Sequence, residues 1–396
     1  MVREACLFDV VPLFGDLDHD REHPAVAAIE AVMRAFSGPV LATASEAVTW
    51  RHRPVVAHAV EKPDRHARVA IWRAQLPFAS DATVVAAADS YQLRPGTIVA
   101  AARNAIAVSD GDVTIESIHT GVRAQIGTEL GGLATRIEWR QTWDDLVLPP
   151  DQIDQVIELM ARARHRSTVL ESWGFGPKVG KGHGLTALFS GPPGTGKTMV
   201  AGLVASELGL DLYQVDLSKI VSKYIGETEK HLAALFDAAE SGHAILLFDE
   251  ADSLFAKRSA VKSSNDRYAN LEVNFLLQRI ESFTGICLLT TNNETAIDEA
   301  FRRRLSLHVR FPVPEDDQRQ GLWEAMIPAA APVEPNLDMS RLASEFEMSG
   351  GYIKNAMMRA AYLAADENTA ISMKHLWQSA RAEYEAMGKV AYQRAA

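Results

Sequence analysis

Residues 191–198 read Gly-Pro-Pro-Gly-Thr-Gly-Lys-Thr, which fits the pattern Gly-x-x-x-x-Gly-Lys-Ser/Thr of a phosphate-binding loop. In such a loop, backbone N–H groups surround phosphate oxygens at the N-terminus of a helix. The flanking sequence has the required context, because residues 185–189 form an apolar run suited to a buried strand and residues 198–208 have helical apolar spacing. This context disfavours the alternative, a glycine-rich turn without a ligand. The stretch therefore predicts a nucleoside triphosphate site.

A second run, Ala-Ile-Leu-Leu-Phe-Asp-Glu-Ala-Asp at 244–252, predicts a buried strand that ends in adjacent carboxylates. This arrangement suits Asp249 as a ligand of Mg²⁺ and Glu250 as the group that orients a water molecule. Lys197 is the mobile cation that the loop offers to the β- and γ-phosphates, and Thr198 would share Mg²⁺ with Asp249. The nucleotide-binding residues predicted from both runs are Gly191, Pro192, Pro193, Gly194, Thr195, Gly196, Lys197, Thr198, Met199 and Asp249.

The same region alternates between strand-like and helical patterns. The apolar runs that suit strands are 185–189, 212–215, 244–248, 286–290 and 308–311. Alternation of this kind predicts an α/β P-loop fold with a parallel, doubly wound sheet and ligands at the carboxyl ends of its strands. After Pro312 and Pro314, helix candidates at 341–346, 352–364 and 373–387 predict a small helical lid.

These motifs, in this order, resemble an AAA-family ATPase module over residues 143 to about 390. The resemblance implies ATP and Mg²⁺ as cofactors and a homo-oligomer, expected to be a hexameric ring. Asn292, in Leu-Leu-Thr-Thr-Asn-Asn, matches the sensor asparagine of the family. Within 298–305, Arg303 and Arg304 resemble the arginine finger that reaches the neighbouring subunit's site, and Arg302 is the weaker match. The alternative for these arginines is a basic surface turn.

Residues 222–229, Ser-Lys-Tyr-Ile-Gly-Glu-Thr-Glu, resemble the first pore loop of AAA rings that thread polypeptides. Tyr224 would grip an extended chain, because a flat amphipathic ring gives contact that tolerates many sequences. Lys223 and Ile225 would flank it. The alternative is a surface tyrosine before a helix that begins with acidic residues. Residues 257–266 resemble a second pore loop.

The lid departs from the pattern of many broader AAA-type ATPases, which carry a sensing arginine where this chain reads Ser-Gly-Gly-Tyr-Ile-Lys-Asn at 349–355. Lys354 could take that role, but a solvated helix charge is the favoured interpretation.

The first 140 residues contain segments that parallel the active module, which suggests a degenerate second copy. The parallel segments are 7–14 with 247–255, 38–43 with 285–290, Arg68-x-x-x-Trp72 and Pro77 with Arg319-x-x-x-Trp323 and Pro328, and Tyr91 and Gly96 with Phe346 and Gly351. Val10 stands where the module has Glu250, and Ser45 where it has Asn292. The N-terminal copy would therefore lack the catalytic side chains that Glu250 and Asn292 supply in the active module.

No phosphate loop precedes this copy. We therefore expect that the half of the copy with the phosphate loop was lost, or that the start lies inside a longer reading frame. Arg53 aligns with Arg304, which leaves a residual contact between subunits conceivable. The expected domains are a degenerate α/β region at 1–65, a degenerate lid-like region at 66–140, a large AAA α/β domain at 141–313 and a helical lid at 314–396.

Composition restricts the partners. A net charge of −11 disfavours nucleic acid, which usually requires a basic face. No apolar stretch approaches the ~18 residues of a membrane span, so membrane insertion is not expected. Only two cysteines are present, Cys6 and Cys287, and a cytoplasmic location is the expectation.

The sequence therefore predicts an ATP-hydrolysing ring that remodels, unfolds or disassembles protein substrates. The alternative is a nucleotide-switched scaffold or assembly factor with little turnover, and a nucleic-acid motor is disfavoured by the charge. The segment around Tyr224 resembles both the microtubule-severing and the membrane-complex-disassembling branches. Its combination with a degenerate N-terminal region is similar to ATPases encoded beside bacterial contractile injection systems.

Overall fold

The chain forms two compact units, Met1–Lys62 and Pro63–Ala396, which are described separately. The computed structural model describes residues 10–15, 24–44, 54–60, 63–91, 93–109, 111–130, 132–166, 168–179, 184–217, 227–241, 244–252, 275–293, 297 and 299–389.

The first unit is a small β–α–β arrangement. Strand β1 (Leu13–Phe14) is followed by helix α2 (Pro24–Ala35) and by β2 (Leu41–Ala42). The two strands are parallel, with Leu13 opposite Leu41. The repeat sets residues 7–14 parallel to 247–255, and residues 7–9 lie outside the described part of the chain.

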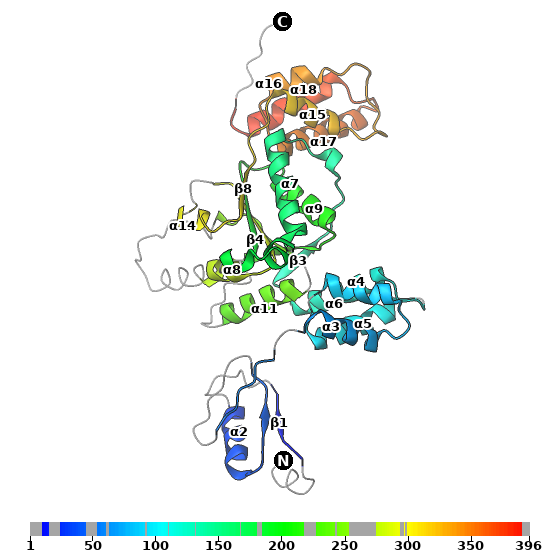
Figure 1. The fold of residues 1–396 in the computed structure, drawn as a ribbon. Helices are drawn as coiled ribbons and strands as arrows, with labels where there is room; N and C mark the ends of the chain where they lie inside the picture. Colours follow the sequence, from blue (N-terminus) through cyan, green and yellow to red (C-terminus); the bar gives the residue numbers. More distant parts are fainter. Residues whose placement is uncertain are drawn as a thin grey trace. The chain divides into compact units, whose positions relative to one another are not determined.

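The second unit contains a six-stranded sheet. One group of helices precedes the sheet in the sequence and another group follows it (Figure 1). Its elements, in chain order, are α3 (Arg65–Gln75), α4 (Asp81–Ser90), α5 (Pro95–Val108), α6 (Ile115–Glu129), β3 (Ala134–Ile137), α7 (Pro150–Arg164), α8 (Gly176–Val179), β4 (Leu185–Ser190), α9 (Lys197–Leu208), β5 (Leu212–Val215), α11 (Glu227–Ser241), β6 (Ile245–Phe248), β7 (Ile286–Thr291), α14 (Glu299–Arg302), β8 (Leu307–Arg310), α15 (Asp316–Ala325), α16 (Met339–Glu345), α17 (Gly350–Asp366) and α18 (Met373–Ala386). Residues 275–282 are also helical, and short helical turns occur at Trp143–Asp145 and Thr168–Ser172.

The strand order in the sheet is β3-β5-β6-β7-β4-β8. The five strands predicted from apolar runs are present and parallel, so the predicted α/β P-loop class is confirmed. The sheet is mixed rather than purely parallel, because β3 pairs antiparallel with β5 at one edge. An edge strand can leave residues partly exposed, and β3 has no fully buried residue. It therefore lacks the apolar run by which the other strands were recognised.

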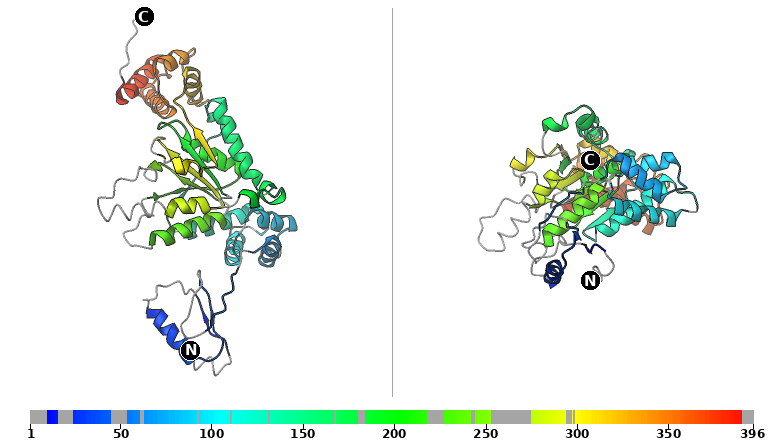
Figure 2. Two further views of the ribbon diagram at one scale, coloured as in Figure 1. Left: turned by 60° about the vertical axis from the view of Figure 1, so that its left-hand side comes forward. Right: turned by 60° about the horizontal axis from the view of Figure 1, so that its bottom comes forward.

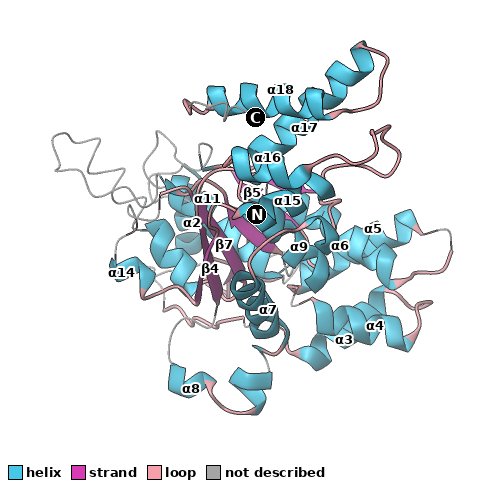
Figure 3. Cartoon of the chain, turned by 90° about the horizontal axis from the view of Figure 1, so that it is seen from above, coloured by secondary structure: helices cyan, strands magenta, loops and turns pink. Residues whose placement is uncertain are grey.

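Alternate residues of the central strands face two different apolar layers. Ile245 and Leu247 pack with α7 and α9, whereas Leu246 and Phe248 pack with α11 and the helical residues 275–282. Helices consequently cover both faces of the sheet, as Figure 2 and Figure 3 show. The strand ends that carry the nucleotide motifs lie between these layers.

The C-terminal lid has four helices in the structure, α15 to α18, packed around Trp323 and Phe346. Three of them were predicted. Helix α15 was missed because its sequence, Asp-Asp-Gln-Arg-Gln-Gly-Leu-Trp-Glu-Ala, contains only two large apolar residues. Its start is fixed instead by a capping box between Glu315 and Gln318.

The helices α3 to α6 repeat several details of this lid. In the lid, buried Arg319 donates from Nε to the carbonyl of Ala343 (2.7 Å) and from a terminal nitrogen to that of Pro314 (2.5 Å). In the earlier group, Arg68 donates in the same way to the carbonyls of Ala88 (3.0 Å) and Pro63 (2.9 Å). Trp72 and Trp323 are both fully buried. The two groups thus use one arginine in the same way to tie their first and second helices together.

The α3–α6 group packs directly on the sheet domain. Its apolar residues belong to the same core as α11 and the strands β5 and β6. Arg94 pairs with Asp237 of α11 at 2.9 Å, and Arg123 pairs with Asp211 at the start of β5 at 2.6 Å. Among the described residues, no helix is long and apolar enough to cross a membrane.

Candidate functional site

The loop between β4 and α9 has the backbone that its glycines predict. Gly191, Gly194 and Gly196 have backbone φ angles of 151°, 75° and 95°, and residues other than glycine rarely adopt such angles. A Cβ on Gly191 would also lie 2.1 Å from the carbonyl oxygen of Phe311. The loop therefore needs glycine at this position for space as well as for conformation.

Lys197 begins helix α9 and turns its ammonium group back onto the loop. Its Nζ donates to the carbonyls of Gly191 (2.7 Å) and Pro192 (2.8 Å) and to Oδ1 of Asn292 (2.8 Å). Burial lowers the pKa of this ammonium, and Asp249 is the strongest of the nearby carboxylates that oppose the shift. The structure thus brings the predicted loop lysine and the predicted sensor asparagine into direct contact. Met199 follows in α9, where its side chain is partly buried.

Asp249 follows strand β6 and lies opposite the first turn of α9. Its carboxylate is 3.4 Å from the hydroxyl of Thr198 and accepts a bond from Nε2 of Gln214 at 3.3 Å. A shorter bond, 2.5 Å, comes from the hydroxyl of Thr290 at the end of β7. The predicted pair Thr198 and Asp249 is therefore brought together, and two further residues hold the carboxylate.

Glu250 is exposed and has a positive φ of 51°. Its backbone N–H donates to the hydroxyl of Thr290 at 2.9 Å. The turn after β7, which carries Asn292, is held in a related way. The carboxylate of Asp252 accepts a hydrogen bond from the hydroxyl of Thr291 and one from the backbone N–H of Asn292 at 3.4 Å. Side chains on β7 and on the turn after β6 thus fix each other.

The N-terminus of lid helix α17 lies against the phosphate loop. Gly351 donates its backbone N–H to the carbonyl of Gly194 at 2.9 Å, and the Ser349 hydroxyl donates to that of Pro193 at 3.0 Å. A Cβ on Gly351 would lie 3.0 Å from Cα of Gly194. Two glycines therefore allow the lid and the loop to meet through their backbones.

The residues at these strand ends fit the triphosphate of ATP and Mg²⁺. The glycine backbone and Lys197 suit phosphate oxygens, and Thr198 and Asp249 supply the oxygen ligands that Mg²⁺ prefers. Among the described residues, no group of three or more His, Cys, Asp or Glu side chains could hold a metal ion. Mg²⁺ is commonly held by one or two carboxylates together with the phosphates of the nucleotide, so the donor set fits that mode.

Two family models match this chain. Residues 187–313 match the ATPase family associated with various cellular activities (AAA), and residues 315–385 match the contractile injection system ATPase helical domain. The chain contains an AAA ATPase domain. The first match covers the phosphate loop, Asp249, Glu250 and Asn292, and the second covers the lid. The resemblance inferred from the motifs is confirmed, including its likeness to contractile injection system ATPases.

Curated relatives of the AAA domain come from distant organisms. Fidgetin-like protein 1 of Drosophila melanogaster is 34% identical over 171 residues, which cover 42% of this chain and 32% of that protein. Katanin p60 ATPase-containing subunit A1 of Strongylocentrotus purpuratus is 33% identical over 190 residues, or 45% of this chain and 36% of that protein. The proteasome-activating nucleotidase of Methanopyrus kandleri is 27% identical over 235 residues, or 57% of this chain and 52% of that protein. The chain thus spans about a third of the length of the first two relatives.

The arginines predicted to act between subunits lie on and after α14 of the AAA domain. Arg302 is partly buried, and Arg303 and Arg304 are exposed. Arg304 pairs with Glu281 at 2.6 Å. Lys354, the other cation considered from the sequence, is exposed on α17.

Several predicted residues lie outside the described part of the chain. They are Lys223, Tyr224 and Ile225 of the first pore loop, residues 257–266 of the second, and Ser45 and Arg53 of the N-terminal copy. Their roles stay predictions.

Three residues of the AAA site were not assigned roles from the sequence: Gln214, Thr290 and Asp252. Thr290 and Asp252 belong to runs that were recognised as strand ends, and Gln214 is the polar residue just before the last position of β5, Leu-Tyr-Gln-Val at 212–215. The available signal was a polar side chain close to the carboxyl end of a buried strand, which is where ligands of parallel sheets bind.

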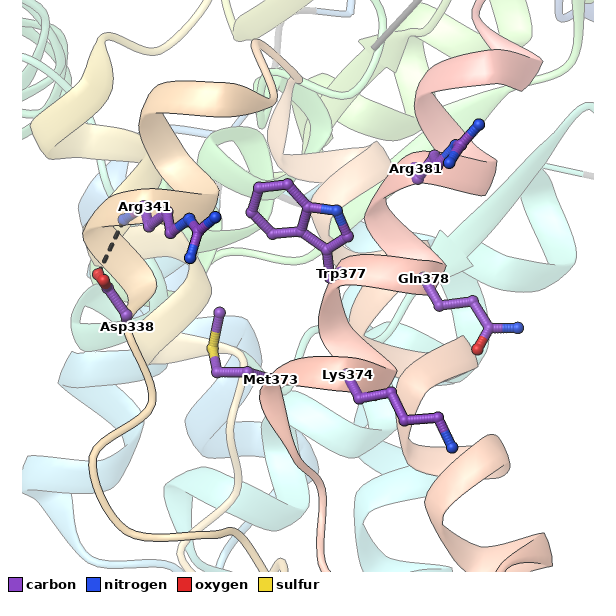
Figure 4. A pocket seen from close by; sticks show the side chains of 7 residues that line it. All are labelled: Asp338, Arg341, Met373, Lys374, Trp377, Gln378 and Arg381. Carbon is purple, nitrogen blue, oxygen red and sulfur yellow. Dashed lines mark hydrogen bonds between the residues drawn. The ribbon is translucent and has the colours of Figure 1, made fainter. Parts of the chain in front are cut away.

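A separate pocket of about 580 Å³ lies in the lid between α16 and α18. Figure 4 shows Arg341 pointing toward Trp377, and the guanidinium carbon lies 5.0 Å from the ring centre. Asp338 accepts a bond from the backbone N–H of Arg341 at 2.9 Å. None of the lining residues belongs to the phosphate site, so this pocket is not the predicted nucleotide site.

Proposed function

We propose that the protein hydrolyses ATP and uses the cycle to remodel, unfold or disassemble protein substrates. The observation that carries the proposal is the convergence of Lys197, Thr198, Asp249, Glu250 and Asn292 at neighbouring strand ends. Each of these side chains has a chemical role in phosphoryl transfer to water. The AAA match and the relatives support the same reaction.

In the proposed site, the loop backbone and Lys197 bind the β- and γ-phosphates and hold the nucleotide in one orientation. Thr198 and Asp249 are the residues that would hold Mg²⁺, which when bound neutralises charge on the phosphate oxygens. Asn292 lies beside Lys197 and orients groups near the γ-phosphate. Glu250 is exposed in the turn after β6 and accepts a proton from the attacking water at its carboxylate.

The proposed assembly is a homo-oligomeric ring, taken to be a hexamer, in the cytoplasm. Arg303 and Arg304 would complete the neighbouring subunit's site, where a cation supplied in trans is worth about 10³–10⁵ in rate. Tyr224, with Lys223 and Ile225, would contact a polypeptide in the central channel. These assignments are supported by the family resemblance and by the exposure of Arg303 and Arg304.

We further propose that residues 1–140 are a degenerate AAA-like half-module, with the α/β region at 1–65 and the lid-like region at 66–140. The matching contacts of Arg68 and Arg319, and the buried Trp72 and Trp323, support this relation. The active module would then comprise the large domain at 141–313 and the lid at 314–396, and strand β3 (Ala134–Ile137) of the preceding region is added to the sheet of the large domain.

The competing function is a scaffold that changes partners with nucleotide occupancy and turns over little. Steady-state ATP hydrolysis by the purified full chain separates the two. The Glu250→Gln variant is the control, because its amide keeps the size of the side chain but cannot accept the proton. We expect clear turnover by the wild type and a fall of about 10²–10⁴-fold in Glu250→Gln.

Electron micrographs of Glu250→Gln with ATP test the assembly, because a site that binds ATP without hydrolysis should keep the ring together.

In the turnover experiment, binding of ATP without turnover by the wild type would favour the scaffold. A Glu250→Gln variant as active as the wild type would remove Glu250 from the reaction.

A further inference from the structure

Strands β6 and β7 run parallel, and their register places Phe248 opposite Leu289. The next residues along the two strands, Asp249 and Thr290, are therefore neighbours at the carboxyl edge of the sheet. Thr290 is 1% exposed, so its hydroxyl must find its partners inside the protein.

The hydroxyl of Thr290 contacts both acidic residues that follow β6. It donates to Oδ1 of Asp249 at 2.5 Å and accepts the backbone N–H of Glu250 at 2.9 Å. A hydroxyl has one donor and two acceptor positions, so both bonds can form together. The carbonyl of Thr290 also accepts the N–H of Ala251 at 2.8 Å. One residue thus holds three consecutive positions of the turn.

The turn needs such support for two reasons. Glu250 has a left-handed backbone with φ of 51°, a conformation that is unfavourable for a residue with a Cβ. The contacts of the Asp249 carboxylate with Thr198 at 3.4 Å and with Gln214 at 3.3 Å are longer than its bond to Thr290. The Thr290 hydroxyl consequently holds the carboxylate of Asp249 and the backbone of Glu250.

We propose that Thr290 is a positioning residue for ATP hydrolysis: its hydroxyl orients Asp249 toward the metal and fixes the turn that directs Glu250 toward water. This inference rests on the proposed ATPase function. It assigns no contact between Thr290 and nucleotide, so Thr290 acts through the two carboxylates alone.

The test compares Thr290→Ser, which keeps the hydroxyl, with Thr290→Ala, which removes it, and with Thr290→Val, which keeps the branched shape without it. Thr186→Val is the matched control. Thr186 is also a buried threonine of this sheet. It lies at the amino end of β4, away from the nucleotide site, and its backbone forms hydrogen bonds with Ser306. Each variant is measured for kcat and KM, for melting temperature, and for binding of a fluorescent ATP analogue at graded Mg²⁺ concentrations.

We expect Thr290→Ala and Thr290→Val to lose about 10–100-fold in kcat and to need more Mg²⁺ for half-maximal binding of the analogue, as for other groups that orient metal ligands. Thr290→Ser should retain most of the wild-type kcat and Mg²⁺ dependence. Thr186→Val should retain both as well. A side chain that only stabilised the strand would change the melting temperature without changing the Mg²⁺ requirement.

Wild-type kcat and Mg²⁺ dependence in Thr290→Ala would overturn the inference, and so would a Thr290→Ser variant as impaired as Thr290→Ala. If Thr290→Val does not fold, the Ser and Ala variants still decide, because they differ only in the hydroxyl. An absence of turnover in the wild type is a different outcome. It would reject the proposed ATPase function itself.

Discussion

Lys197 donates to three oxygen acceptors and is only 8% exposed, so the protein itself orients its ammonium group over the phosphate loop. Replacement by alanine removes the one cation of the phosphate loop. We expect Lys197→Ala to weaken binding of a fluorescent ATP analogue by at least about tenfold, the value of a lost charge-assisted hydrogen bond. Titration of the analogue at fixed Mg²⁺ measures this change.

Lys354→Ala is the matched control for this prediction. Lys354 is an exposed lysine near the start of α17, and we expect its removal to leave analogue binding unchanged. Equal loss in both variants would mean that Lys354 also contacts the nucleotide. Undiminished binding by Lys197→Ala would remove the phosphate-site assignment.

The sequence was sufficient for the residues whose role follows from a short motif. The loop glycines, Lys197, Thr198 and Asp249 are brought together as their spacing predicts. The sequence was insufficient for Thr290, because its role depends on which residues of β6 and β7 lie side by side. That register is fixed by packing across the sheet and is not encoded in either run alone.

At the scale of elements, the lid and the phosphate loop meet at two glycines, Gly351 and Gly194, through a backbone hydrogen bond of 2.9 Å. A Cβ on Gly351 would lie 3.0 Å from Cα of Gly194, whereas a Cβ on Gly96, the aligned position in α5, would have no neighbour within 4 Å. We expect Gly351→Ala to push the lid from the loop, at a cost of about 1–3 kcal/mol, and to weaken analogue binding. Thermal melting and analogue titration measure the two effects.

Gly96→Ala should instead stabilise the protein slightly, by about 0.4–1 kcal/mol, because alanine narrows the unfolded ensemble and nothing opposes its methyl group. It should leave analogue binding unchanged. If Gly351→Ala behaves as Gly96→Ala does, the contact between the lid and the loop does not contribute to nucleotide binding.

Elements were predictable where burial on both sides leaves a clear apolar pattern. The strands β4 and β6 are fully buried and were recognised as apolar runs. Strand β3 and helix α15 were missed for a common reason. Each is fixed mainly by contacts with other segments, β3 by pairing with β5 and α15 by the bonds of Arg319 to the carbonyls of Ala343 and Pro314. Patterns read along the chain do not report such contacts.

At the scale of the whole molecule, the proposed ring requires that a subunit complete its neighbour's site. Arg304 is on the surface and pairs with Glu281 of its own subunit, a contact between partly exposed groups that is weak enough to be exchanged. We predict that Arg304→Ala and Lys197→Ala are each inactive alone but recover ATPase activity when mixed. In a mixed ring, some interfaces combine an intact phosphate loop from the Arg304→Ala subunit with an intact arginine from the Lys197→Ala subunit.

The control for this experiment is a mixture of Lys197→Ala with Glu250→Gln. Both changes lie in the same nucleotide site, so every site in that mixed ring carries one of them and no activity should return. Steady-state ATPase assays over a series of mixing ratios measure the recovery, and co-assembly is checked by size-exclusion chromatography. If the Lys197→Ala and Arg304→Ala subunits assemble together and remain inactive at every ratio, Arg304 does not act across the interface. Recovery in the control mixture as well would show that activity does not come from interfaces that pair an intact phosphate loop with an intact arginine.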